Sequence, residues 1–119
     1  MRLYRFFLGT DTNGADVNAK QLALDLAAKY FPAGHTVSDT IGRWIGEVGV
    51  IDEATIVVDW LTELDAPECE IVAKDFAGDY KQQANQEAVL VTFFDVSAVY
   101  VWSKRSFLAS YLVLSRRYF

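Results

Sequence analysis

The sequence has very few of the residues that most often carry disulfides, metal ions or phosphate groups. Its only cysteine, Cys69, cannot form a disulfide within the chain, which favours a reducing, cytoplasmic setting. Its only histidine, His35, lies 34 positions from that cysteine, and a zinc ion needs three or four ligands, so we expect no metal site. None of the seven glycines has the spacing of a phosphate-binding loop. We therefore expect a protein without a cofactor.

Long apolar runs are missing as well. The apolar run at residues 3–8 stops at Gly9. It is too short for a secretory leader, and far short of the ~20 residues that cross a bilayer, so we expect no membrane span. The net charge of −5 argues against general binding to nucleic acids, because neutralising phosphates requires clustered cations. The C-terminal region is the one place where nucleic acid could bind.

Acidic residues are absent from that C-terminal region. All sixteen lie in residues 1–95, whereas residues 96–119 contribute four basic residues and several aromatic ones. We therefore divide the chain into a domain at 1–95 and a basic, aromatic extension at 96–119, which suits a helix or a strand equally. Opposite charges and apolar stripes in one chain favour self-association into a homo-oligomer. The stripe expected at the interface comprises Phe107, Tyr111, Leu114 and Tyr118.

The chain is rich in alternating strand-like and helix-like segments. Runs of apolar, β-branched and aromatic residues alternate with segments whose apolar residues recur every three or four positions. Right-handed crossovers then place two helices on one face of an antiparallel sheet with strand order 4-1-3-2. This predicts an α+β, ferredoxin-like βαββαβ sandwich with a C-terminal extension. The expected elements are strands at 3–8, 35–47, 55–61 and 87–94, which 97–102 would continue, and helices at 18–30 and 65–85.

The apolar positions within these segments also predict the core. Asn18 is a suitable N-cap for the first helix, and Asp65 for the second. The second helix is expected to face the sheet with Ile71, Val72, Phe76 and Tyr80. The core residues expected from the strands are Phe6, Leu8, Ile56, Val58, Val89 and Val91.

Several short motifs occur in order along residues 4–95. The chain reads Phe-Pro-Ala-Gly-His-Thr-Val from Phe31, Gly-Arg-Trp from Gly42, a glutamate at Glu53, and Gln-Glu-Ala-Val-Leu from Gln86. In these motifs it resembles an uncharacterised family of small bacterial and phage proteins of unknown function. The resemblance implies the fold and no activity. The chain departs from the family pattern in having no basic residue beside that glutamate.

Arg43 and Trp44 are the first candidates for a ligand site. A guanidinium beside an indole can hold an anionic or planar ligand by paired hydrogen bonds and stacking. Trp60 lies on the strand expected to pair beside them. Trp44 is expected on an edge strand, where packing has less need of an aromatic ring. The alternative interpretation is structural, with tryptophan in the core and arginine at its rim.

Two further positions are secondary candidates. His35 could act as a general base or sense pH, or it could only cap the turn where it lies. Glu87 follows Asn85 and Gln86 just before the last strand. These amides and this carboxylate could recognise a nucleobase or ribose edge, or they could satisfy the last carbonyl groups of the helix.

The features together favour a non-enzymatic binding module. No sequence signature of a serine or cysteine nucleophile is present. The expected function is to sequester a small nucleotide-like or anionic ligand, or to block a macromolecular partner such as a host protein. A phage accessory or counter-defence protein would act in this way. The alternative is a small enzyme of the dimeric αβ-barrel type that uses His35 or a carboxylate in its cleft.

Overall fold

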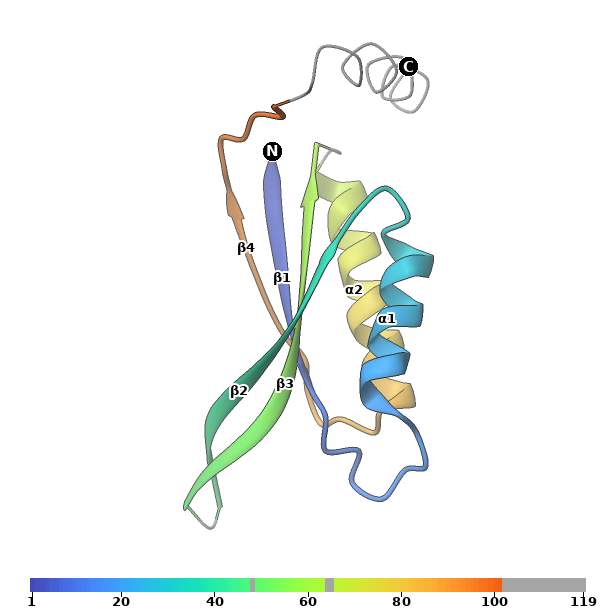
Figure 1. The fold of residues 1–119 in the computed structure, drawn as a ribbon, viewed down its shortest axis with the longest axis vertical. Helices are drawn as coiled ribbons and strands as arrows, with labels where there is room; N and C mark the ends of the chain where they lie inside the picture. The colour runs from blue at the N-terminus through green and yellow to red at the C-terminus, as the bar shows by residue number, and fades with distance from the viewer. Residues whose placement is uncertain (48, 64–65, 102–119) are drawn as a thin grey trace.

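The computed structural model describes residues 1–47, 49–63 and 66–101 (Figure 1). No helix in this part of the chain is both long and apolar enough to cross a bilayer. The order of the elements confirms the predicted α+β, ferredoxin-like βαββαβ fold. The elements are β1 (Arg2–Gly9), α1 (Ala19–Tyr30), β2 (Thr36–Gly46), β3 (Gly49–Thr62), α2 (Ala66–Gln83) and β4 (Leu90–Asp95).

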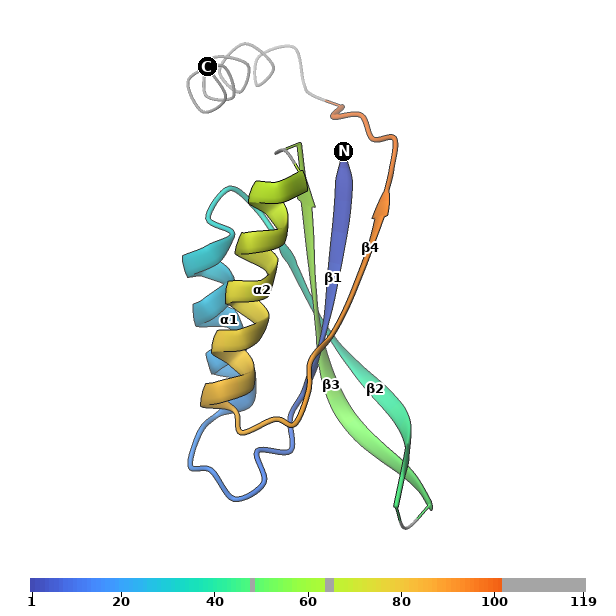
Figure 2. The same cartoon turned by 180° about the vertical axis from the view of Figure 1, so that it is seen from behind.

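The four strands form one antiparallel sheet. Their order is β2-β3-β1-β4, as the crossover argument predicted. Both helices cover the same face of the sheet (Figures 1 and 2), and the other face carries no described element. The hairpin of β2 and β3 continues beyond the ends of the helices (Figure 1). The far half of this hairpin is therefore exposed on both sides.

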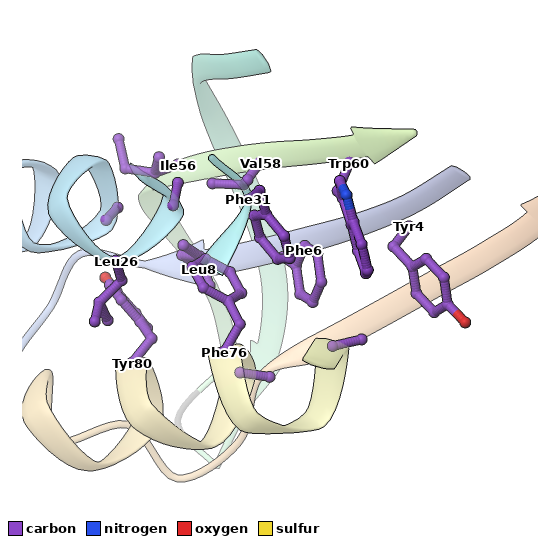
Figure 3. Close-up of a cluster of buried hydrophobic side chains, with 14 of the residues drawn as sticks. Tyr4, Phe6, Leu8, Leu26, Phe31, Ile56, Val58, Trp60, Phe76 and Tyr80 are labelled. Carbon is purple, nitrogen blue, oxygen red and sulfur yellow. The ribbon is translucent and has the colours of Figure 1, made fainter. Parts of the chain in front are cut away.

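The hydrophobic core lies between the helices and the central strands (Figure 3). The ring centroid of Phe31 lies 4.6 Å from that of Trp60, and the rings of Phe6 and Phe76 meet edge to face at 4.7 Å. Such ring pairs add about 0.5–1.5 kcal/mol beyond the burial of their area. The predicted strand residues all belong to this core. Phe6, Leu8, Ile56 and Val58 are buried, and Val89 and Val91 are half-buried against it.

The inward face of α2 differs from the prediction at one position. Ile71 is 62% exposed, whereas Cys69, Ala73 and Phe76 are buried. Because each residue turns a helix by about 100°, a side chain two positions from both Cys69 and Ala73 lies on the opposite side of the helix. The prediction for Ile71 was wrong, since small side chains, not the largest aliphatic one, face the sheet here.

The ends of two strands also differ from the prediction. β3 begins at Gly49, six residues before the predicted start at residue 55. The exposed Asp52 and half-buried Glu53 interrupt the apolar pattern, so the sequence did not indicate this first part of the strand. β2 and β3 pair one to one along their whole length. β4 begins at Leu90 instead of residue 87, and residues 97–101 form no strand. The predicted cap and interface residues Asp65, Phe107, Tyr111, Leu114 and Tyr118 lie outside the described residues.

Side-chain hydrogen bonds fix the start of α1 and join the two helices. The Asn18 side chain accepts from the backbone N–H of Gln21 at 3.0 Å, which confirms the predicted cap. At the other end of α1, the Tyr30 hydroxyl donates to Asp79 of α2 at 2.7 Å. This bond, together with one from Gln83, holds the pKa of Asp79 below its usual range.

Candidate functional site

The structure places His35 far from the other predicted ligand residues. It lies between α1 and β2, where its Nδ1 is 3.0 Å from the carbonyl oxygen of Phe31. Trp44 lies near the other end of β2. At ~3.3 Å per residue, the strand separates the two by about 30 Å. His35 therefore belongs to the turn after α1 and shares no site with Trp44.

Arg43 and Trp44 lie on opposite faces of β2, because successive side chains of a strand alternate. Val37, seven positions before Trp44, packs against the core, so Trp44 faces away from the helices. Arg43 donates two hydrogen bonds to Asp52 across the hairpin, at 2.7 and 3.3 Å. This carboxylate raises the pKa of the guanidinium. The structure thus pairs Arg43 with a carboxylate and does not bring it together with Trp44.

Trp44 lies over the backbone of Gly42 on the face away from the helices. A Cβ atom at Gly42 would be 2.8 Å from the indole Nε1 and 2.6 Å from Oγ1 of Thr55, so no larger residue fits beneath the ring. Trp44 as a whole is 40% exposed. These residues line, with Phe7 and Val57, a shallow hollow of about 410 Å³. Trp44 therefore offers an accessible flat surface beside a hollow.

The end of β1 brings two further polar side chains together over a second glycine. A Cβ atom at Gly9 would overlap Oε1 of Glu53 and lie 2.6 Å from Oε1 of Gln86. Glu53 comes from β3, and Gln86 from the connection between α2 and β4. Both side chains are half-buried. Two oxygen atoms from distant parts of the sequence therefore converge on the bare backbone of Gly9.

The groups at the two glycines are continuous across the sheet. Gly42 pairs with Glu53 between β2 and β3, and Gly9 pairs with Thr55 between β1 and β3. The indole therefore lies over β2, and the carboxylate and amide oxygen atoms lie together over β1, two strands away at ~4.8 Å per strand. We name this row the hairpin-base site, comprising Gly9, Gly42, Trp44, Glu53 and Gln86.

Tyr80 supports the hairpin-base site from the helix side. Its ring is fully buried, and its hydroxyl donates to the carbonyl oxygen of Gly9. Burial, followed by the negative charge of Glu53, raises the pKa of Tyr80 to about 12. The hydroxyl is therefore protonated at neutral pH. It holds the end of β1 in place and does not exchange a proton there.

The charge of the hairpin-base site comes from the carboxylate of Glu53. No ion pair among the described residues involves Glu53. The same part of the chain holds no group of three histidine, cysteine, aspartate or glutamate side chains that could bind a metal ion. The exposed indole and the two oxygen atoms at Gly9 can offer stacking and hydrogen-bond acceptors to a ligand.

Sequence reasoning found part of the hairpin-base site and missed the rest. Glu87, the predicted carboxylate, is exposed, whereas its neighbour Gln86 reaches Gly9. Glu53 was not a predicted ligand residue, although it occurs among the family-like motifs. Glu53 was therefore visible in the sequence as part of a motif. Its contact region with Gln86 was not, because the two residues are far apart along the chain.

Comparison with known proteins gives a likeness of fold. No protein-family model matches the sequence, and no curated protein matches it significantly. A phage SAM lyase in complex with S-methyl-5′-thioadenosine has a TM-score of 0.63 at 14% identity, over 87% of this chain and 92% of that chain. A phage SAM lyase in the apo state has a TM-score of 0.61 at 12% identity, over 85% of this chain and 92% of that chain. CutA from Pyrococcus horikoshii has a TM-score of 0.55 at 11% identity, over 92% and 93%. The chain shares its ferredoxin-like fold with these proteins.

Proposed function

We propose that this chain binds S-adenosylmethionine, or a closely related adenosine thioether, at the hairpin-base site. The observation that carries the proposal is the meeting of an indole, a carboxylate and an amide oxygen over two bare glycines on one face of the sheet. The ligand has a flat base, ribose hydroxyl groups and a positively charged sulfonium. Each of these groups has a chemical counterpart in the site.

The dimensions of the row fit a nucleoside. Three adjacent strands span roughly 10 Å, which is about the length of adenine joined to ribose. The exposed indole of Trp44 lies at one end of the row and can stack against the base. Stacking of a base on an aromatic side chain contributes ~1–3 kcal/mol. The oxygen atoms of Glu53 and Gln86 then face the ribose.

Charge narrows the ligand class further. The sequence left nucleotide-like and anionic ligands open, but the carboxylate of Glu53 opposes a phosphate group at this position. A neutral ribose or a sulfonium cation is favoured by the same carboxylate. The site therefore suits a nucleoside without a phosphate next to its ribose.

The likeness of fold supports a role of the phage accessory kind. The two structures of the phage SAM lyase are matched over most of both chains, and one of them holds S-methyl-5′-thioadenosine. A small protein that withholds or destroys S-adenosylmethionine would deprive methyl-transfer reactions of their donor. This is one way in which a counter-defence protein can act without touching a host protein.

Two modes of action fit the hairpin-base site, namely sequestration and cleavage. Forming S-methyl-5′-thioadenosine breaks the bond between sulfur and the amino-acid portion of S-adenosylmethionine. The electron pair stays on sulfur, which loses its positive charge, and the substrate's own carboxylate can form the new bond to that carbon. No proton has to move, so a site remote from His35 is chemically sufficient for cleavage.

The test measures binding and turnover together. Purified protein is titrated with S-adenosylmethionine by calorimetry, and the mixture is analysed by chromatography for S-methyl-5′-thioadenosine. Glu53→Gln is expected to weaken binding roughly tenfold or more, because a charged hydrogen bond contributes about 1.5–3 kcal/mol. Glu70→Gln, on the exposed side of α2, is the matched control. Binding without product indicates sequestration, and no binding by the wild-type protein refutes the proposal.

We further propose that the chain is a homo-oligomer. Large apolar side chains lie exposed on the sheet face away from the helices, among them Leu61 (37%), Leu90 (49%) and Phe94 (46%). Exposed apolar patches on monomers rarely exceed a few hundred Å². Light scattering at micromolar concentration is expected to give a multiple of 13.4 kDa. A monomer mass would show that the extension or another partner covers this face.

A further inference from the structure

We propose that the hairpin-base site recognises its nucleoside through the two ribose hydroxyl groups, because the amide of Gln86 is held so that only its oxygen faces the ligand. This inference rests on the proposed function and specifies which part of the ligand the site selects. It makes Gln86 a residue that determines specificity, in partnership with Glu53.

The orientation of the Gln86 amide follows from its hydrogen bonds. Its Nε2 donates to the carbonyl oxygen of Asp11 and, at 3.1 Å, to that of Ala84. An amide nitrogen has two N–H groups, so these two bonds use both of them. The amide oxygen is the remaining polar atom, and it points over Gly9. Gln86 can therefore accept a hydrogen bond from a ligand but cannot donate one.

The loops that carry these carbonyl groups are themselves joined. Asn13 Nδ2 donates to the carbonyl oxygen of Asn85 at 2.9 Å, and Asn85 Nδ2 lies 3.4 Å from that of Asn13. Both residues have positive φ angles, 51° and 52°, a conformation that asparagine tolerates better than most residues. The Asp11 side chain also accepts from the backbone N–H of Asn13 at 2.9 Å. This reciprocal pair ties the loop that carries Gln86 to the loop that carries Asp11.

Glu53 gives the site the same character. An ionised carboxylate only accepts hydrogen bonds. Because Glu53 Oε1 and Gln86 Oε1 converge over Gly9, the ligand must present hydrogen-bond donors to both. The vicinal hydroxyl groups of ribose are two donors on adjacent carbon atoms. One is expected to donate to the carboxylate and the other to the amide oxygen.

The test compares three ligands on the intact wild-type protein. Calorimetry measures the affinity of S-methyl-5′-thioadenosine and of its 2′-deoxy and 3′-deoxy analogues. Each deoxy analogue leaves one half-buried acceptor without a donor, so each is expected to bind roughly tenfold or more weakly than the parent. No variant is needed for this comparison, and it therefore cannot fail through misfolding.

A variant then assigns one hydroxyl group to Gln86. Gln86→Met keeps the length of the side chain and removes the acceptor, so one of the two deoxy penalties is expected to fall to about twofold or less while the other persists. Gln82→Met, at an exposed position at the end of α2, is the matched control and should retain both penalties. Circular dichroism checks that both variants are folded.

The possible outcomes separate this inference from the proposed function. If neither S-adenosylmethionine nor the parent nucleoside binds, the proposed function is wrong and this inference is wrong with it; if only S-adenosylmethionine binds, the proposed function stands and this inference is refuted. If the parent binds and both deoxy analogues bind equally well, the ligand class stands and recognition through the diol is refuted. If Gln86→Met still binds both deoxy analogues as weakly, relative to the parent, as the wild-type protein does, only the role of Gln86 is refuted.

Discussion

Replacing Gly9 with alanine tests the hairpin-base site with a single methyl group. The new Cβ would overlap Oε1 of Glu53 and lie 2.6 Å from Oε1 of Gln86, so both acceptors must move. The φ angle of Gly9 is not among the positive ones, so alanine brings no backbone strain. The atoms displaced are the ends of long side chains and not backbone, so the loss is expected mainly in binding; strain on the two hydrogen bonds that hold the Gln86 amide would add a smaller loss of stability.

The expected loss of binding free energy is larger than the expected change in the free energy of unfolding. Losing the two hydrogen bonds, one of them to a carboxylate, should weaken nucleoside binding by about 2–4 kcal/mol, or roughly 30- to 1,000-fold. Alanine also restricts the unfolded chain, which stabilises a protein by about 0.4–1 kcal/mol at a compatible site. This gain offsets the local rearrangement, so the free energy of unfolding should change by less than about 1 kcal/mol.

Gly78→Ala provides the matched control for Gly9→Ala. Gly78 lies within α2, and a Cβ atom there would meet no other atom within 4 Å. Alanine should stabilise the helix by about 0.5–1 kcal/mol and leave binding unchanged. Calorimetry and urea unfolding on both variants provide the two readouts. Wild-type affinity in Gly9→Ala would show that Glu53 and Gln86 do not contact the ligand, and global unfolding would show that Gly9 serves the fold.

Three further changes probe the surroundings of the site. Gly42→Ala should push the indole of Trp44 off the sheet, shift its fluorescence and weaken stacking with a nucleoside; unchanged emission and affinity would contradict the described packing. Tyr80→Phe should lower the free energy of unfolding by about 1–3 kcal/mol in urea, because it leaves the half-buried carbonyl group of Gly9 without this donor. The pKa of Asp79 is lower in the folded protein than its value of about 4 in the unfolded chain. The ionised carboxylate therefore stabilises the fold above about pH 4, and this contribution is lost as the pH falls through the folded pKa. As the pH falls, the wild-type protein should therefore lose more of its free energy of unfolding than Tyr30→Phe does. An equal loss in the two proteins would exclude this contribution.

The fold could be predicted from the sequence because its elements are marked by local chemistry. The apolar run of β1, the cap at Asn18 and the crossovers between strands together define the sheet order. The length of the hairpin could not be predicted in the same way. Its far half is exposed, and the charged pair of exposed Asp52 and half-buried Glu53 does not show the apolar alternation of a strand that packs on a core.

The candidate site was predictable only where it depends on one strand. Strand alternation alone separates Arg43 from Trp44, and the exposed position of Trp44 followed from its place on an edge strand. Gln86 and not Glu87 reaches Gly9, and the asparagine that precedes them has a positive φ angle; an asparagine after a helix permits that angle but does not say which of the next side chains turns inward. The meeting of Glu53 with Gln86 is a tertiary contact, and periodicity carries no information about it.

The reciprocal pair of Asn13 and Asn85 has a consequence for the chemical ageing of the protein. Asn13 is followed by Gly14, and an asparagine before glycine is poorly protected against cyclisation of its side chain and loss of ammonia. Deamidation replaces Nδ2 with an oxygen atom, which removes the donor to the carbonyl group of Asn85 and adds a negative charge. Warm, alkaline storage would therefore degrade the ligand site before the core, and mass spectrometry would detect the damage as a gain of about one mass unit.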